Sequence, residues 1–342
     1  MNIDMQNIKN KIAKMLIMGF DTQSASKDDD VYKCVLELGI GGVILFDKFY
    51  EDRTKTKNIQ DPKQLKELTA QLQSISSRKL LISIDQEGGN VARLKEDYGF
   101  NKSLSAKKIA SMDKNEAKKQ YSILSKELED LGINVDFAPL VDLGVNKDSD
   151  VIYKLDRSYS DDPDIVTKYA EVFMDELHKH NVISCLKHFP GHGSARGDSH
   201  EGFVDVTNTW SEVELEPYKQ LLHKTKIIMT AHVFNKNIDD KYPATLSYNT
   251  NTKLLRETIG YNGVIIGDDL QMGAIKEHYT KEEALKLAIN AGVDLIMYCN
   301  QLGDDKAEDI IEIIYKLVQS GEIPLKRIEE SNKRIDKLLG DM

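Results

Sequence analysis

Short apolar runs alternate along the chain with longer segments of helical periodicity. Eight runs have the length and composition of buried strands, namely residues 15–20, 42–46, 80–84, 133–139, 182–186, 227–232, 263–268 and 294–299. Apolar residues recur every three or four positions in residues 63–75, 115–131, 164–180, 211–222, 252–259, 281–291 and 306–319. The alternation predicts an α/β fold with a parallel sheet, and eight strands predict a single (β/α)8 barrel of the TIM type, slightly irregular in places.

The domain organisation follows from the same pattern. No Gly/Ser-rich linker, repeat or low-complexity tract interrupts the 342 residues, so we expect one domain over residues 1–342. The polar segments 48–56 and 146–163 lack clear periodicity and are expected to be loops over the strand ends. Residues 324–342 predict a C-terminal helix that closes the barrel, because apolar residues recur there at helical spacing.

Composition narrows the setting of this barrel. The chain is 40% apolar and 30% charged, and no apolar run approaches the ~18 residues of a membrane span. Residues 1–20 carry too many charges for a signal peptide, so we expect a cytoplasmic protein without a membrane partner. A formal net charge of −10 argues against nucleic acid as a partner. Three cysteines without CxxC spacing are expected to be reduced core thiols: Cys34, Cys185 and Cys299.

Residues 187–200 hold the densest group of reactive side chains. They bring together three histidines with a lysine, an arginine and an aspartate, directly after the apolar run 182–186. Pro190 and the glycines that follow it exclude a helix, so we expect a loop that starts at Lys187. Because parallel α/β folds place their active sites at the carboxyl ends of strands, this loop is the first candidate for a functional site.

Two carboxylates lie at the ends of other predicted strands. Asp85 follows the run 80–84, and Asp268 ends the run 263–268. Either residue alone could cap a following turn or helix. Together with Lys187 on the same rim, however, they predict a pocket for a polar ligand, since a carboxylate at a buried strand end is costly without a partner.

The motifs at these strand ends resemble those of a known family. Lys187 to Gly193 read Lys-His-Phe-Pro-Gly-His-Gly, followed by Asp198-Ser199-His200, with Asp-Gln-Glu-Gly-Gly at 85–89 and Asp-Asp-Leu-Gln-Met at 268–272. This combination is similar to the β-N-acetylglucosaminidases of glycoside hydrolase family 3, of the bacterial peptidoglycan-recycling type. The resemblance implies a monomeric barrel enzyme without cofactor or metal, which removes terminal N-acetylglucosamine from muropeptides with retention through a covalent glycosyl-enzyme.

The resemblance also implies roles for particular residues. Asp268 is expected to be the nucleophile, with Asp269 as the competing assignment; strand alternation should direct only one of the two to the sugar. His200 is expected to be the general acid/base and Asp198 the residue that orients it, since imidazole titrates near neutral pH. The expected sugar-binding residues are Asp85, Arg93, Arg157, Lys187 and His188. His192 is expected chiefly to shape the loop.

Three alternatives remain open from the residues alone. A retaining N-acetylglucosaminide phosphorylase of the same family is possible electrostatically, because a neutral imidazole does not repel phosphate as a carboxylate would. A metal-dependent barrel hydrolase would use the histidines and Asp198 as ligands, although Pro190 and Gly191 prevent His188 and His192 from sharing a helix face. A non-catalytic sugar-binding protein would not need Asp268 or the pair Asp198 and His200.

Overall fold

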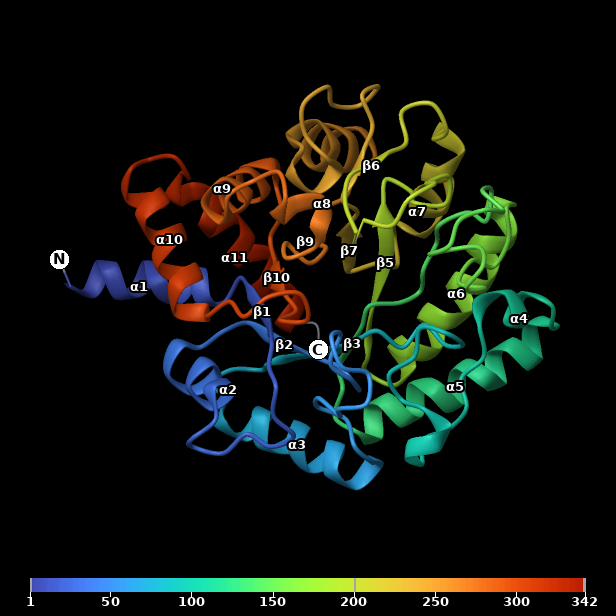
Figure 1. Ribbon diagram of the computed structural model, residues 1–342, viewed down its shortest axis with the longest axis horizontal. Helices are drawn as coiled ribbons and strands as arrows, with labels where there is room; N and C mark the ends of the chain where they lie inside the picture. The colour runs from blue at the N-terminus through green and yellow to red at the C-terminus, as the bar shows by residue number, and fades with distance from the viewer. Residues whose placement is uncertain (1, 200, 341–342) are drawn as a thin grey trace.

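Eight parallel strands form the centre of the molecule, with helices arranged around them (Figure 1). The computed structural model describes residues 2–199 and 201–340. The barrel strands are β1 (Leu16–Gly19), β2 (Gly42–Leu45), β3 (Leu81–Ile84), β4 (Val135–Asp136), β5 (Ile183–Phe189), β7 (Ile227–Thr230), β9 (Val264–Gly267) and β10 (Ile296–Tyr298). They are paired in chain order, and β1 also pairs with β10. A parallel bridge between Ile266 and Leu295 closes the remaining gap, so the predicted (β/α)8 barrel is confirmed.

The outer layer contains eight longer helices and several short ones. The longer helices are α1 (Asn2–Ala13), α3 (Pro62–Ile75), α5 (Lys114–Asp130), α6 (Pro163–Lys179), α7 (Glu216–Leu221), α9 (Lys281–Ala291), α10 (Ala307–Gln319) and α11 (Leu325–Gly340). The short helices are α2 (Asp30–Lys33), α4 (Ala106–Ala110) and α8 (Gly273–Lys276). Lys9 and Lys11 of α1 form ion pairs with Glu312 of α10 and Glu329 of α11, which joins the two ends of the chain.

The strand sequences explain why the barrel forms where it does. Every residue of β1, β2, β3 and β9 is buried, as expected for parallel strands covered on one face by helices and on the other by the barrel interior. Helices begin where a capping side chain precedes the apolar stripe. Asp61 and Asp113 accept backbone N–H groups at the starts of α3 and α5, and Thr280 forms a capping box with Glu283 at the start of α9.

Several local expectations from the sequence need correction. The predicted strand 133–139 is reduced to β4, although hydrogen bonds to its neighbours continue: the N–H of Phe137 donates to the carbonyl of Ile84, and the carbonyl of Ala138 accepts the N–H of Cys185. Strand β5 continues to Phe189, so Lys187 and His188 lie on the strand rather than in the loop that we expected from residue 187 onwards.

Two predicted helices also differ in form. Residues 211–222 start as a 3-10 turn (Glu212–Leu215) and become α-helical only at α7, where Pro217 fits the first turn. Residues 252–258 of the second predicted helix lie within a π-helical segment, Asn249–Thr258, and Ile259 follows its end. The structure also contains a second π-helical segment (Cys34–Leu38) and 3-10 turns at Glu96–Tyr98 and Ala244–Leu246.

A buried carboxylate holds the amino-terminal end of the barrel together. Asp294, just before β10, is fully buried and accepts the backbone N–H of Ile265 at 3.0 Å. Arg256 and Arg327 each lie 2.6 Å from one of its oxygens, and Arg334 lies 3.2 Å away. Since two of these arginines belong to α11, the helix predicted over residues 324–342 is fastened to the barrel floor through Asp294.

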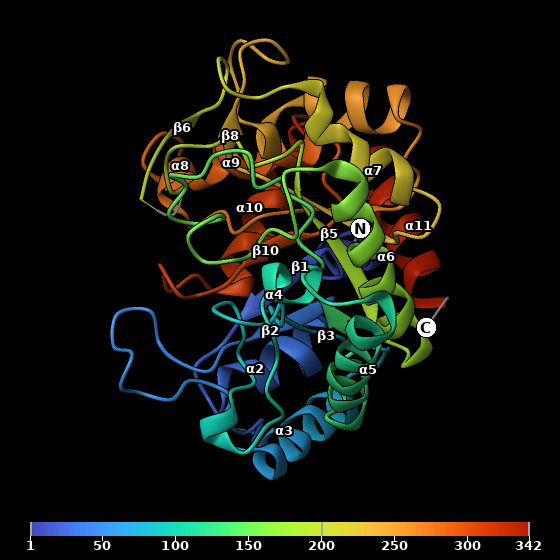
Figure 2. The same cartoon turned by 90° about the vertical axis from the view of Figure 1, so that its right-hand side faces the viewer.

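The opposite end of the barrel carries the long connections. The segment between β2 and α3 extends from this end, which also carries the small sheet of β6 (Val204–Asp205) and β8 (Val233–Phe234) (Figure 2). In the described parts of the chain, none of the helices combines the length and apolar character that a membrane crossing requires. The loops predicted over the strand ends are present at this end of the barrel, and they surround the pocket described next.

Candidate active site

A cavity of about 330 Å³ opens at the carboxyl ends of the barrel strands. Seven of the eight predicted site residues line it: Asp85, Arg93, Arg157, Lys187, His188, Asp198 and Asp268. The eighth, His200, lies outside the described residues. The structure thus brings together side chains that are up to 183 positions apart in the sequence, from Asp85 to Asp268, because each follows or ends a barrel strand or lies in a connecting loop.

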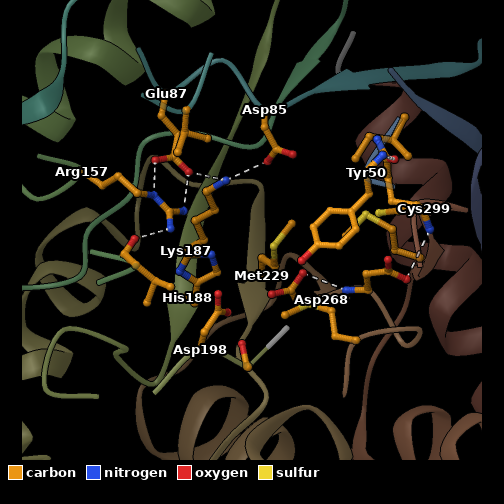
Figure 3. Close-up of a pocket in the computed structure, with 18 of the residues that line it drawn as sticks. Tyr50, Asp85, Glu87, Arg157, Lys187, His188, Asp198, Met229, Asp268 and Cys299 are labelled. Atoms are coloured by element: carbon orange, nitrogen blue, oxygen red, sulfur yellow. Dashed lines mark hydrogen bonds and ion pairs between the residues drawn. The ribbon is translucent and has the colours of Figure 1, made fainter. Parts of the chain in front are cut away.

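Lys187 is the centre of the polar floor of this cavity (Figure 3). Its Nζ lies 2.8 Å from Oδ1 of Asp85 and 2.8 Å from Oε1 of Glu87, and only 3% of its side chain is exposed. Burial alone would lower the pKa of this ammonium, but the two carboxylates outweigh it and hold the pKa above its usual value. Lys187 therefore stays charged and can donate to a ligand in the cavity.

Arg157 reinforces the same cluster from the loop between β4 and α6. Its Nε and Nη2 donate to Oε2 and Oε1 of Glu87 at 2.8 and 2.7 Å, a bidentate pair. Its Nη1 donates to the carbonyl of Val151 at 2.8 Å. Although burial raises the pKa of Glu87, Arg157 and Lys187 lower it to about 2, so this carboxylate is ionised. Glu87 thus fixes both cations and leaves them little freedom to move.

Asp85 has the exposure expected of a ligand-binding carboxylate. It is 17% exposed, with Lys187 on one oxygen and Nη2 of Arg93 on the other at 3.3 Å. Burial would raise its pKa, but these two cations hold the pKa below the usual range. An ionised carboxylate with a face toward the cavity can accept hydrogen bonds from two vicinal sugar hydroxyls. Arg93 and Arg157, both expected to bind the sugar, line the cavity, and each forms an ion pair with a carboxylate of its floor.

His188 is oriented by a second buried carboxylate. Its Nδ1 lies 2.7 Å from Oδ2 of Asp142, whose side chain is fully buried. Asp142 also accepts the backbone N–H groups of His188 and His192. Burial raises the pKa of Asp142, but His188 outweighs it and lowers the pKa below its usual value. Because Nδ1 is held by Asp142, Nε2 is the ring nitrogen left for a ligand, as in the His–carboxylate pairs of other enzymes.

His192 lines the cavity too, which extends the role we expected for it. Burial lowers the pKa of its imidazole to about 4, so the ring is neutral near pH 7. The rings of His188 and His192 meet edge to face with centroids 5.8 Å apart. A neutral His192 thus adds an uncharged polar edge to a floor that is otherwise ionic.

Asp268 and Asp269 both reach the cavity, contrary to our expectation from strand alternation. Strand β9 ends at Gly267, so the alternation of side chains does not extend to either residue. Oδ1 of Asp269 accepts the backbone N–H groups of Gln271 and Cys299 at 3.1 and 3.3 Å, and burial raises its pKa to about 6. Asp269 is thus committed to holding the turn, and its own N–H donates to Oδ1 of Asp268 at 2.8 Å.

The loop after β5 brings Asp198 and Ser199 to the cavity from another side. The carbonyl of Ser199 accepts the N–H of Ala274 in α8 at 3.1 Å, which docks this loop against the helix that follows Asp268. At the start of the loop, the N–H of Gly193 donates to Oε2 of Glu214 at 3.0 Å. The indole N–H of Trp210 donates to the carbonyl of Pro190 at 2.9 Å. These contacts hold both ends of the loop.

Glu214 gives a pH-dependent prediction, because burial raises its pKa to about 7 from the value of 4.5 expected when exposed. The folded state keeps a proton that the unfolded state has lost, so its contribution to stability decreases as pH rises from 4.5 to about 7. Relative to Glu214→Gln, we expect the unfolding free energy of the wild type to fall over this range, at most about 1.4 kcal/mol per pH unit.

Urea denaturation of both proteins across that pH range measures this difference. Glu212→Gln is the matched control, since Glu212 is exposed in the same 3-10 turn, and it should follow the wild-type pH dependence. Parallel pH curves for wild type and Glu214→Gln would show that Glu214 titrates as an ordinary exposed carboxyl.

Sequence reasoning missed several residues that contribute to the site. Glu87 lines the cavity and Asp142 holds His188 there, but neither was predicted, since their partners Arg157 and His188 lie 70 and 46 positions away. A signal was present for both: Glu87 is inside the motif at 85–89, and Asp142 follows the predicted strand 133–139. The loop 48–56 was expected only as a covering, but Tyr50 and Arg53 also line the cavity.

A parallel barrel whose strand ends surround an ionised, hydrogen-bonding cavity has the architecture of a barrel enzyme that acts on a polar ligand. Residues 7–338 match the family described as "Glycosyl hydrolase family 3 N terminal domain", so the chain belongs to glycosyl hydrolase family 3. The family expected from the motifs is confirmed, and with it the expected class, glycoside hydrolase.

Individual relatives agree with this family. The chain is 33% identical over 328 residues to beta-hexosaminidase A of Pseudoalteromonas piscicida, which covers 87% of this chain and 53% of the relative. It is 34% identical over 289 residues to a beta-hexosaminidase of Tolumonas auensis, and the match covers 82% of this chain and 81% of the relative. A solved glycoside hydrolase family 3 beta-N-acetylglucosaminidase from a Paenibacillus species superimposes with a TM-score of 0.87 at 32% identity, over 97% of this chain and 62% of that one. The chain thus spans about half of the first relative.

Proposed function

We propose that the chain is a retaining exo-β-N-acetylglucosaminidase. The observation that carries the proposal is the meeting of three kinds of group in one cavity: the ionic floor around Lys187, the carboxylate Asp268, and the loop that carries Asp198. The floor supplies donors and acceptors for the hydroxyls of one terminal sugar. The other two groups are those that a double-displacement reaction needs, a nucleophile and part of a proton-transfer pair.

In this reaction a carboxylate oxygen of Asp268 bonds to the anomeric carbon as the bond to the leaving oxygen breaks. His200 gives its proton to that oxygen, and the leaving group departs as an alcohol. Water then attacks the anomeric carbon, His200 takes a proton from it, and the bond to Asp268 breaks to release the sugar. Asp198 would stabilise the protonated imidazole and fix its orientation, as carboxylates do in other hydrolases.

As physiological substrates we propose muropeptides from peptidoglycan, cleaved by a cytoplasmic monomer as part of cell-wall recycling. The family resemblance of the motifs supports this choice. Hydrolysis is favoured over phosphorolysis because water is abundant and the sequence contains no Gly-rich phosphate cradle.

The proposed function is tested with the α and β anomers of p-nitrophenyl N-acetylglucosaminide. We expect turnover of the β anomer alone, with free N-acetylglucosamine as the main product whether or not phosphate is present. Calorimetric binding of N-acetylglucosamine without any turnover would instead indicate a sugar-binding protein. N-acetylglucosamine 1-phosphate as the main product, with the anomeric configuration retained, would indicate a phosphorylase.

The role of His200 gives a separate prediction. His200→Ala should lower kcat on β-N-acetylglucosaminides with poor leaving groups by about 10²–10⁴-fold, the usual contribution of general acid catalysis. Aryl glycosides with acidic phenols should lose much less, because their leaving oxygen needs no proton. A series of aryl glycosides with increasing pKa of the phenol measures how the loss of kcat depends on the leaving group. An equal loss across the series would assign His200 to substrate or loop positioning instead.

A further inference from the structure

The segment between β2 and α3 forms an ordered arm over the cavity. We call residues 47–57 the β2–α3 arm. Lys48 and Thr56 form an antiparallel bridge, and the N–H of Phe49 donates to the carbonyl of Lys55, so the arm folds back on itself like a hairpin. At its base, the N–H of Lys57 donates to the carbonyl of Asp47 at 2.9 Å. The arm is thus a built element rather than a loose covering.

The arm is also tied to the connection that follows β10. The N–H of Tyr50 donates to Oε1 of Gln301 at 2.9 Å, and Nε2 of Gln301 donates back to the carbonyl of Lys48 at 3.0 Å. Lys57, which is fully buried, bonds to the carbonyl of Asn300 and lies 3.1 Å from Oδ1 of Asp21. These contacts fix the backbone of the arm on two sides, which keeps the position of Tyr50 defined.

Tyr50 and Arg53 are the arm's contribution to the lining of the cavity. Figure 3 shows the ring of Tyr50 directed toward the centre of the cavity. The ring is backed by the guanidinium of Arg53, whose central carbon lies 4.9 Å from the ring centroid. Tyr50 is 41% exposed and Arg53 is also exposed, whereas the floor around Lys187 is buried. The pair therefore belongs to the mouth of the cavity.

Arg53 differs from the other cations in the cavity in the contacts that its charged group makes. Arg93, Arg157 and Lys187 each contact a carboxylate of the floor, Asp85 or Glu87. For Arg53, by contrast, no carboxylate contact is found within residues 2–199 and 201–340, and its guanidinium rests on the ring of Tyr50. An arginine held against an aromatic ring keeps its donors in a fixed plane, which suits a carboxylate in the same cavity.

We infer that Tyr50 and Arg53 form a leaving-group subsite that selects N-acetylglucosaminides whose leaving sugar carries a carboxylate. The inference rests on the proposed function, because it places the terminal sugar on the buried floor and the remainder of the substrate at the mouth. The apolar face of the leaving sugar packs on the Tyr50 ring, and Arg53 donates to the carboxylate. In a chain with a net charge of −10, such a local cation offsets the general repulsion of acidic substrates.

A matched pair of disaccharides tests this subsite. N,N′-diacetylchitobiose has a neutral leaving sugar, and N-acetylglucosaminyl-β-1,4-N-acetylmuramic acid differs from it by one lactyl ether with its carboxylate. We expect kcat/KM of the wild type to favour the acidic disaccharide, and Arg53→Ala to lower this selectivity ratio roughly tenfold, as for the loss of one charge-assisted hydrogen bond. Added salt should lower the ratio in the wild type and have little effect in Arg53→Ala.

The control is Lys55→Ala, which removes a cation of the same arm whose side chain is 71% exposed and which does not line the cavity. It should keep the wild-type ratio. Tyr50→Ala should lower kcat/KM on both disaccharides, because either leaving sugar loses the ring on which it packs. An unchanged ratio in Arg53→Ala, or an equal drop in Lys55→Ala, would overturn the subsite. Absence of turnover of chitobiose and of the nitrophenyl glycoside by the wild type would overturn the proposed function itself.

Discussion

Asp268→Asn is expected to abolish turnover while leaving the fold and the binding of N-acetylglucosamine nearly intact. The amide is almost the same shape as the carboxylate but is a poor nucleophile, so no glycosyl-enzyme forms. Loss of the nucleophile in a covalent mechanism lowers kcat by roughly 10⁴-fold or more. Steady-state kinetics on the nitrophenyl β-glycoside measure the loss, and calorimetric titration with N-acetylglucosamine measures the binding that remains.

Asp269→Asn is the matched control for this assignment. Asp269 uses Oδ1 to accept the N–H groups of Gln271 and Cys299, and an asparagine can keep both bonds through its own amide oxygen. Turnover should therefore fall far less than in Asp268→Asn. The assignment would be reversed if Asp269→Asn were the inactive variant and Asp268→Asn retained most of its kcat.

Asp294→Ala should produce the largest loss of stability. The substitution leaves Arg256, Arg327 and Arg334 next to one another without their common carboxylate, at exposures of only 10%, 12% and 26%. Removing one partner of a buried ionic cluster costs about 3–5 kcal/mol of unfolding free energy. The cluster lies at the amino-terminal end of the barrel, away from the cavity, so kcat of the folded protein should be unchanged.

Urea denaturation and an activity assay on the same preparations separate the two effects. Asp240→Ala is a suitable control, because Asp240 is exposed. Its substitution should change the unfolding free energy by less than about 0.5 kcal/mol. If Asp294→Ala unfolded at the same urea concentration as Asp240→Ala, the three arginines would not depend on Asp294 for their burial.

The fold could be predicted because parallel barrel strands are buried on both faces and read as apolar runs. Strands β1, β2, β3 and β9 illustrate this, since all their residues are buried. Their exact ends were less predictable. Lys187 and His188 lie on β5, and their side chains contact Asp85, Glu87 and Asp142, which follow other strands and which the local sequence does not reveal as partners.

The candidate site likewise contains residues that the local sequence reveals and residues that it does not. Asp85 and Asp268 could be selected because each stands at the end of an apolar run, where a barrel places its ligands. Tyr50 and Arg53 could not, since their approach to the cavity depends on the bonds between Tyr50, Lys48 and Gln301, which are distant in the sequence. Partners brought together by tertiary structure leave no periodic pattern, so only the three-dimensional arrangement identifies them.

The stereochemistry of the first product tests the central claim most directly. In proton NMR of the reaction in D₂O, a glycosyl-enzyme attached to Asp268 predicts that β-N-acetylglucosamine forms first from a β-glycoside and mutarotates only later. Immediate formation of the α anomer would contradict the account, because it would require direct attack by water and leave no role for Asp268 as a nucleophile.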